Sequence, residues 1–167
     1  AALVGGAHTI NIGSALPTIT DAVIIDGTTE PDFASTPIIE LNGAGAGAGV
    51  NGLVVTATNS TIRGLVINRF SADGVQLDGD SNTVAGNYVG TDVTGAIDRG
   101  NAQNGIQINS ANNIIGGTAA ADRNVVSGND NSGISLTGAA ATGNVVLGNY
   151  IGTNAAGTVA LGNTNSG

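Results

Sequence analysis

Residues 82–105 read NTVAGNYVGTDVTGAIDRGNAQNG, and residues 144–167 read NVVLGNYIGTNAAGTVALGNTNSG. The two stretches match in one frame at a constant offset of 62 residues, and the matched positions include Gly86, Asn87, Tyr88, Gly90 and Thr91. Self-similarity at a fixed spacing is the signature of a repeat architecture, in which each unit is sheltered by its neighbours. The repeats therefore decide the fold before any single element is assigned.

A shorter unit lies inside this repeat and begins at Gly52, Gly74, Gly105 and Gly133. Each glycine is followed by an apolar, a mainly polar and a second apolar residue. Superimposing the four copies gives one apolar column (Leu53, Val75, Ile106, Ile134) and, two residues further on, a second (Val55, Leu77, Ile108, Leu136). Alternation with a period of two predicts short extended strands that bury one face.

Two further strand families follow each of these strands. The first contains the aliphatic residues Ile62, Val84, Ile115 and Val146, which we expect to point inward, and the second contains Tyr88-Val89 and Tyr150-Ile151. Three short strands in about 20–34 residues, with no helical periodicity, favour a chain that winds in stacked coils with parallel sheets. An antiparallel sandwich with glycine-rich turns is the alternative, but it predicts hairpins rather than columns of one residue type.

The blocks NTVAGNYVGT, NGIQI, NNIIGG, RNVVSGN and GNVVLGNYIGT resemble the repeats of right-handed parallel β-helix proteins in the pectin-lyase-like superfamily. The segment PTITDAVIIDGTTEP, followed by PIIELNG, resembles an early coil of such proteins. The resemblance is strongest to repetitive secreted or surface bacterial proteins, and it implies an extracellular or cell-surface location. That superfamily includes polysaccharide lyases, hydrolases, epimerases, adhesins and structural proteins, so the resemblance implies a fold and not an activity.

We therefore expect an all-β chain, a right-handed parallel β-helix of roughly 5–7 coils with three short strands each. Residues 1–167 are expected to form one domain. Residues 1–51 contribute less regular early coils, and residues 52–167 contribute regular repeats with longer loops on one side. Asparagines such as Asn87, Asn149, Asn101 and Asn163 recur at the predicted corners, where their side chains can satisfy backbone groups.

Composition excludes several classes of function. The chain has no cysteine and no lysine, and its 12 acidic residues outweigh 4 arginines to give a net charge of −8. This charge argues against nucleic acid as a partner, and no apolar stretch is long enough for membrane insertion. The sequence also lacks an adjacent Asp-Asp pair and a lysine base, and its single histidine is His8. We expect no catalytic residues, although an enzymatic activity stays open.

The densest acidic group lies around Asp78 and Asp80. The run Asp78-Gly79-Asp80-Ser81-Asn82 resembles the start of a calcium loop, which makes Asp78, Asp80 and Asn82 the candidate metal ligands. The pattern then departs from that loop, because Thr83 stands where a glycine is needed and Val89 where a glutamate is needed. We therefore expect ordinary turn residues here and no cofactor, with calcium as the alternative.

Three longer connections, Gly90 to Asn104, Gly117 to Arg123 and Gly152 to Ser166, are expected to protrude on one side of the coils. Exposed ion pairs explain their charged residues, and the alternative is a surface for a glycan or a surface protein. The residues of that predicted surface are Asp92, Asp98, Arg99, Asp122 and Arg123. Tyr88 and Tyr150 are expected to lie two coils apart and to be structural.

The two ends carry a further expectation, because terminal coils of a solenoid expose strand edges unless they are capped. The candidate assembly ends are Ala2, Leu3 and Val4 at the start and Asn165, Ser166 and Gly167 at the finish. Two interpretations follow: the chain is a piece of a longer β-helix, or it associates end to end with itself and forms a filament. Overall, the sequence favours a non-catalytic extracellular structural or adhesin-like module, with a carbohydrate-active enzyme fragment or a glycan-binding module as the alternative.

Overall fold

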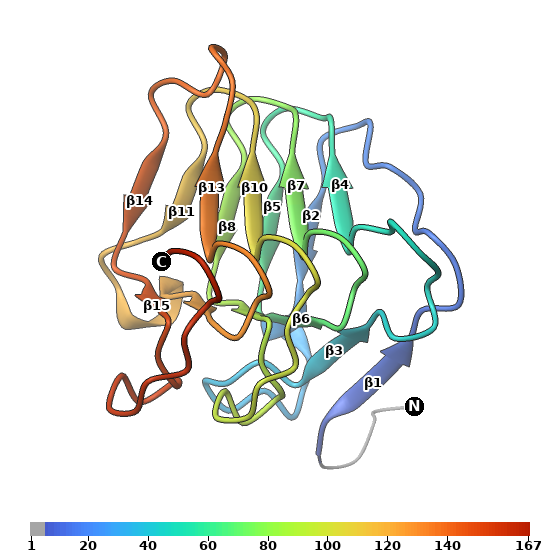
Figure 1. The fold of residues 1–167 in the computed structure, drawn as a ribbon, viewed down its shortest axis with the longest axis vertical. Coiled ribbons are helices and arrows are strands. Elements are labelled where there is room, and N and C mark those ends of the chain that lie inside the picture. Colours follow the sequence, from blue (N-terminus) through green and yellow to red (C-terminus); the bar gives the residue numbers. More distant parts are fainter. Residues whose placement is uncertain (1–5) are drawn as a thin grey trace.

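The computed structural model describes residues 6–167 and consists of three parallel sheets wound from one chain (Figure 1). Each sheet takes one short strand from each turn of the chain. Sheet B contains β4 (Leu53–Val55), β7 (Val75–Leu77), β10 (Ile106–Ile108) and β13 (Ile134–Leu136). Sheet C contains β2 (Ile24–Asp26), β5 (Thr61–Arg63), β8 (Thr83–Ala85), β11 (Ile114–Gly116) and β14 (Val145–Leu147). Sheet A contains β1 (His8–Asn11), β3 (Ile39–Asn42), β6 (Leu65–Asn68), β9 (Tyr88–Val89), β12 (Val125–Val126) and β15 (Tyr150–Ile151).

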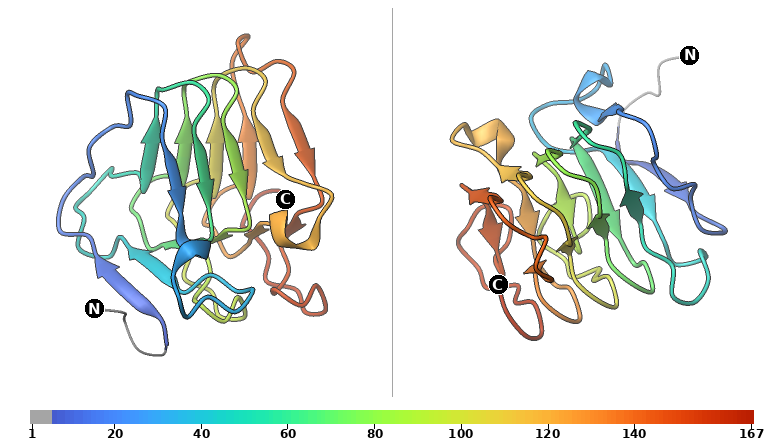
Figure 2. Two further views of the ribbon diagram at one scale, coloured as in Figure 1. Left: turned by 180° about the vertical axis from the view of Figure 1, so that it is seen from behind. Right: turned by 90° about the horizontal axis from the view of Figure 1, so that it is seen from above.

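The chain passes through sheets B, C and A in turn and then starts the next coil, which confirms the predicted parallel β-helix. There are about five coils. The first coil contributes to sheet B only through an isolated bridge between Ile19 and Val55. Sheets B and C face each other and sheet A closes the third side, so that the coils lie one upon another (Figure 2).

The interior follows the predicted columns. Val75 pairs with Leu53 on one side and with Ile106 on the other, and Ile106 pairs in turn with Ile134. The inward residues of the middle coils are fully shielded, and Ile62, Val84 and Ile115 of sheet C are 1%, 0% and 0% exposed. The core is thin because each strand offers only one or two inward side chains, and it depends on neighbouring coils for its burial.

The corner between sheets C and A is short in most coils. Gly64, Gly86 and Gly148 occupy it with φ of 69°, 66° and 71°, a left-handed conformation that glycine adopts without strain. At Gly86 and Gly148 an asparagine follows at once, which accounts for the recurring Gly-Asn pair in the sequence. Connections this short keep sheets C and A at a fixed angle to each other.

Asparagine side chains form a column at each of the three corners, here called the asparagine ladders. The ladder between sheets B and C contains Asn82, Asn113 and Asn144; the ladder between C and A contains Asn87, Asn124 and Asn149; the ladder between A and B contains Asn101, Asn129 and Asn163. In each ladder the backbone N–H of one asparagine donates to the Oδ1 of the asparagine in the next coil. The expected role of corner asparagines is therefore confirmed.

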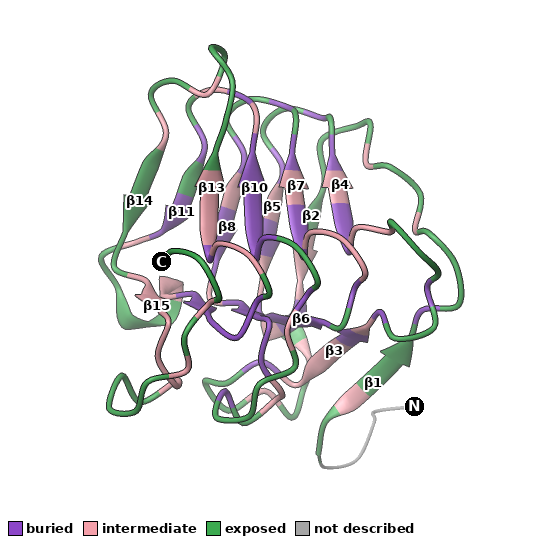
Figure 3. Ribbon diagram, viewed as in Figure 1, coloured by how far each residue is buried: buried purple, intermediate pink, exposed green. Residues whose placement is uncertain are grey.

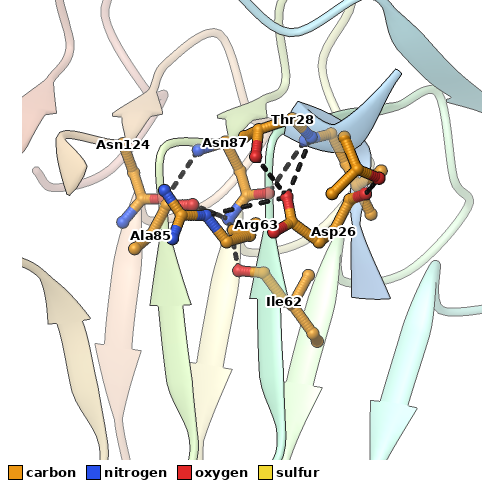
Figure 4. Close-up of polar contacts among 9 residues, drawn as sticks. Asp26, Thr28, Ile62, Arg63, Ala85, Asn87 and Asn124 are labelled. Carbon is orange, nitrogen blue, oxygen red and sulfur yellow. Dashed lines mark hydrogen bonds and ion pairs between the residues drawn. The ribbon is translucent and has the colours of Figure 1, made fainter. Parts of the chain in front are cut away.

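The ladders are buried and fully bonded in the middle of the molecule. Asn124 Oδ1 accepts from the backbone N–H of Asn87 at 2.9 Å (Figure 4). Asn124 Nδ2 donates to the carbonyl of Val84 at 2.8 Å. Buried polar groups are tolerated only when they are paired, and here every step of the coil supplies the partner. The ladders therefore fix the vertical register of neighbouring coils.

The terminal coils are much more exposed than the middle ones (Figure 3). Val146 of β14 is 41% exposed, although its counterparts Ile115 and Val84 in the middle coils are 0% exposed, whereas Val145 is 46% exposed much like its partner Ile114 at 44%. At the other end, Ile24 of β2 is 72% exposed. The candidate assembly residues Ala2, Leu3 and Val4 lie outside the described residues.

One predicted feature of the connections is wrong. Residues 90–104 and 152–166 leave the corner between sheets A and B, but residues 117–123 join β11 to β12 at the corner between sheets C and A. This third connection carries the 3-10 turn η2 (Ala120–Asp122), and a second 3-10 turn, η1 (Gly27–Thr29), follows β2. Within residues 6–167 there is no helix with the length and apolar character needed to cross a bilayer.

Candidate functional site

A groove of about 630 Å³ lies on the outer face of sheet A, near its corner with sheet C. Its residues come from five different segments of the chain. They are Thr28, Phe33, Ser35, Thr36, Pro37, Arg63, Gly86, Tyr88, Ala120, Ala121, Arg123, Val125 and Ala155. Tyr88 and Val125 form the floor, because they are outward-facing neighbours on β9 and β12.

The groove forms because the connections between sheets C and A differ in length from one coil to the next. The second and third coils pass from sheet C to sheet A through the short corners at Gly64 and Gly86. The first coil inserts residues 27–38 at the same corner, and the fourth coil inserts residues 117–124. Because coils are spaced by about 4.8 Å, the two insertions stand about 14 Å apart and enclose the short corners between them.

A further wall comes from the loops that leave sheet A on its other side. Residues 91–98 and 153–160 each close with an antiparallel bridge, Thr91 to Asp98 and Thr153 to Ala160. The two loops are joined by a hydrogen bond from the N–H of Ala155 to the carbonyl of Gly95 at 2.8 Å. Val93 and Ala155 pack on the outward residues of sheet A, so this side of the groove is apolar.

Asp92 stabilises the first of these loops. Its Oδ1 accepts from the Thr94 hydroxyl at 2.8 Å and from the N–H groups of Ile97 and Ala96 at 3.1 and 3.2 Å. Partial burial of this carboxyl favours a higher pKa, but the hydrogen bonds from Thr94, Ile97 and Ala96 outweigh it and lower the pKa. Asp92 therefore acts as an ionised turn residue that points into its own loop.

Two of the four arginines line the groove. Arg63 Nε lies 3.7 Å from Asp26 Oδ1, and that same oxygen already accepts from the N–H of Thr28 at 2.9 Å and from its hydroxyl at 2.6 Å (Figure 4). Arg63 Nε is buried and has no hydrogen-bond partner among residues 6–167. The ion pair is thus long, and Asp26 is shared with η1.

Arg123 is held more firmly. Its Nε donates to the carbonyl of Gly148 at 3.0 Å, and its guanidinium carbon lies 4.3 Å from the centre of the Tyr150 ring. A guanidinium stacked on an aromatic face is oriented while its terminal N–H groups stay available. Tyr88 forms part of the floor of the groove. Burial raises the pKa of its phenol, which is therefore neutral at physiological pH.

The lining of the groove consists of basic, aromatic, hydroxyl-bearing and small apolar residues. It carries two guanidinium groups, two aromatic rings and the hydroxyls of Thr28, Ser35 and Thr36. None of the residues that line it is acidic or a histidine. Glycoside hydrolysis needs two carboxylates at one bond, and this lining offers none. What it offers is positive charge with hydroxyl and aromatic surface, in a protein whose net charge is −8.

The predicted surface residues are divided among different places. Arg123 lines the groove, and Asp122 belongs to the same connection in η2. Asp92, Asp98 and Arg99 lie in the loop on the other side, where Asp98 Oδ1 accepts from the N–H of Gly100 at 2.9 Å. The sequence analysis did not predict that Arg63 and the insertion at residues 27–38 belong to the groove. The signal that the sequence did offer was the outward position of Arg63 on its strand.

The candidate calcium ligands are held by protein hydrogen bonds. Asp78 accepts from Gln76 Nε2 at 2.7 Å and from Asn109 Nδ2 at 2.8 Å, and Asp80 Oδ1 accepts from the N–H of Ala111 at 2.8 Å. Asn82 is a ladder residue, and its Oδ1 accepts from the N–H of Ser60 at 2.7 Å. All three side chains therefore take part in contacts between neighbouring coils.

A different group of possible metal ligands lies in the first coil. Donor atoms of His8, Glu30 and Asp32 all lie within 4.8 Å of one another. Among the described residues, His8 Nε2 and Glu30 Oε1 are buried without a hydrogen-bond partner. One imidazole and two carboxylates form a donor set that suits a divalent transition metal. This group was not predicted from the sequence, because His8 and Glu30 are far apart along the chain.

The residues at the end of the chain run beside the preceding coil. The N–H of Gly133 donates to the carbonyl of Ser166 at 2.8 Å, and the N–H of Asn165 donates to the carbonyl of Asn131 at 3.0 Å. Asn165 and Ser166 thus complete the corner that leads into sheet B, in register with Asn131 and Ser132. Gly167 follows at the position that Gly105 and Gly133 occupy in their coils.

Comparison with known proteins gives no assignment. No protein-family model matches the chain. No curated protein matches it. No solved structure matches it either. The parallel β-helix is therefore established by the geometry of this molecule alone.

Proposed function

We propose that this chain is a non-catalytic structural module, adhesin-like in construction, of a bacterial extracellular or cell-surface protein. The observation that carries the proposal is the set of asparagine ladders. Asn82, Asn113, Asn124 and Asn129 link consecutive coils through bonds of 2.8–3.2 Å at all three corners. Such ladders add directional bonds to the apolar stacking and resist bending or slipping of one coil on another.

The composition supports the same role. Because the chain has no cysteine, its shape does not depend on the redox state of thiols, and the core is formed largely by aliphatic side chains stacked in register. The groove lining supports a non-catalytic role as well, since it lacks carboxylates. The mechanism of such a module is mechanical: it holds two points at a fixed distance.

Single-molecule pulling along the coil axis tests this role. The chain is expected to resist force and then to lengthen in steps of one coil, such as the 22 residues from Gly52 to Gly74, each releasing about 75 Å. Smooth extension at low force, without such steps, would contradict the proposed mechanical role of the stacked coils. In a separate assay, the protein is incubated with uronate polysaccharides with and without calcium. No cleavage of the polysaccharide, and so no new polysaccharide chain ends, is expected. Turnover that disappears in Arg123→Gln would replace the proposal by an enzyme.

The second candidate is a glycan-binding module, and the groove is the observation that favours it. Arg63 and Arg123 place two positive groups beside the aromatic Tyr88 in a lining without acids. Carboxylates of an acidic sugar would accept from guanidinium N–H groups, and the ring faces of a sugar would lie on the aromatic surface. Under this proposal the ligand is an acidic oligosaccharide rather than a neutral one.

Calorimetry with a uronic acid oligosaccharide and its neutral counterpart tests this candidate. The acidic ligand is expected to bind more tightly, and Arg63→Gln and Arg123→Gln are each expected to weaken binding by about tenfold or more. Arg99→Gln is the matched control, because Arg99 lies in the loop outside the groove. Equal affinity for both oligosaccharides, or an equal loss in the control, would exclude the groove as the site.

A further inference from the structure

His8 stands at a position of sheet A that is aliphatic in the next two coils. It pairs with Ile39 of β3, and Ile39 pairs in turn with Leu65 of β6. Leu65 belongs to the apolar core and Ile39 packs against it, whereas the first strand of the sheet places an imidazole in this column. A polar ring that is shielded from solvent needs a partner, because an unpaired buried polar group is costly.

The connection after β2 brings two carboxylates to this imidazole. Glu30 and Asp32 follow the 3-10 turn η1 directly. The N–H of Phe33 donates to the Glu30 carbonyl at 2.9 Å, which closes a turn around the two acidic residues. One donor atom each of His8, Glu30 and Asp32 lies within 4.8 Å of the other two. Carboxylates this close repel each other, and a cation between them relieves that repulsion.

Two donor atoms of this group are buried and unpaired. His8 Nε2 and Glu30 Oε1 are shielded from solvent, and neither has a hydrogen-bond partner among residues 6–167. In the same range, no arginine forms an ion pair with Glu30. Asp32, by contrast, is an exposed residue at the rim of the group. The group thus combines a shielded imidazole nitrogen and a shielded carboxylate oxygen with a second carboxylate that solvent can reach.

We propose that His8, Glu30 and Asp32 bind one zinc ion, which fastens the connection at residues 27–38 to β1. Zinc binds imidazole nitrogen and carboxylate oxygen at about 2.0–2.2 Å, so the donors of a tetrahedral site lie about 3.3–3.6 Å apart. Because the present separations do not exceed 4.8 Å, side-chain movements of about 1 Å are enough to reach this spacing. Water fills the fourth position, and the imidazole favours zinc over calcium and magnesium, which prefer oxygen ligands.

The same connection forms one wall of the groove. Phe33, Ser35, Thr36 and Pro37 line the groove and follow the two acidic residues within a few positions. The ion therefore anchors the beginning of this wall on the first strand of sheet A. The inference concerns the first coil alone and does not depend on whether the groove binds a glycan.

Titration of the tag-free chain with zinc chloride, followed by calorimetry, tests the site. One ion is expected to bind per chain, and calcium chloride is expected to bind more weakly. His8→Ala and Glu30→Gln are each expected to weaken zinc binding by at least about tenfold, the loss that even outer-shell partners of a metal can cause. Asp21→Asn is the matched control, because Asp21 is an exposed acidic residue of the same coil outside the group, and it is expected to leave the affinity unchanged.

A second measurement needs no variant. His8 is the only histidine in the chain, so its ring signals can be assigned in an NMR spectrum without ambiguity. Saturating zinc is expected to shift one ring nitrogen of His8 and to slow exchange of the Phe33 amide by at least about tenfold, because the turn that this amide closes becomes anchored. Unchanged ring signals overturn the site, as does zinc binding that persists in His8→Ala or falls equally in Asp21→Asn. A ring shift without slower exchange at Phe33 overturns the fastening of the connection.

Discussion

Replacing Asn124 by alanine is the most direct test of the ladders. Its side chain is 0% exposed and makes four hydrogen bonds: Oδ1 accepts from the N–H and the Nδ2 of Asn87, and Nδ2 donates to the Val84 carbonyl and to Asn149 Oδ1. In Asn124→Ala the N–H of Asn87 keeps no partner. An orphaned buried N–H costs about 1–3 kcal/mol, and each other lost bond costs about 0.5–1.5 kcal/mol.

We therefore expect Asn124→Ala to lower the free energy of unfolding by about 3–5 kcal/mol, a large part of the about 5–15 kcal/mol that holds a domain together. The effect should be local as well as global. Exchange of the Asn87 amide is expected to accelerate by about a hundredfold, since about 1.4 kcal/mol corresponds to a factor of ten. Urea unfolding followed by circular dichroism gives the first quantity, and NMR exchange gives the second.

The matched control is Asn165→Ala, because Asn165 is exposed and, within residues 6–167, its side chain bonds only to Asn131. This change is expected to cost less than about 0.5 kcal/mol. If Asn124→Ala proves as mild as Asn165→Ala, then the apolar columns alone hold the coils together and the structural argument from the ladders fails.

Three further predictions concern the core, the corners and the loops. Ile106→Ala is expected to cost about 2–5 kcal/mol in urea unfolding, and Ile134→Ala distinctly less, because Ile106 is fully buried between two coils and Ile134 lies in the last one; equal costs would contradict the stacked core. Gly100→Ala is expected to prevent normal stacking, since a Cβ there would lie 2.1 Å from the carbonyl oxygen of Gly128, and an unchanged melting temperature would refute this. Asp92 has a lowered pKa, so its stabilising effect is present at neutral pH and is lost as the pH falls through that value; wild type and Asp92→Asn should therefore differ in melting temperature at pH 7 and converge in strong acid.

The interior could be predicted from the sequence because it depends on a local rule. Alternation with a period of two gives the inward face of each strand, and repetition gives the neighbour, so Val75 could be paired with Ile106 without a structure. The ladder positions were visible for the same reason, as Asn87 and Asn149 stand at the same place in two copies. What the repeats did not reveal was the direction of the bonds, in which each Oδ1 accepts from the preceding coil.

The groove could not be predicted in the same way. Arg63 belongs to a strand of the second coil and Arg123 to an insertion in the fourth, and no spacing in the sequence relates them. The three long connections look equivalent as sequence, but residues 117–123 follow a strand of sheet C and the other two follow sheet A. Assigning a connection to a corner requires every preceding strand to be counted correctly, which short strands of two or three residues make difficult.

The same contrast indicates where specific contacts arise in a molecule of this kind. Identical coils present identical side chains at each level and therefore give a uniform surface with no preferred place for a ligand. The groove exists because the first and fourth coils have long corners where Gly64 and Gly86 make short ones. A departure from the repeat thus creates the lateral site.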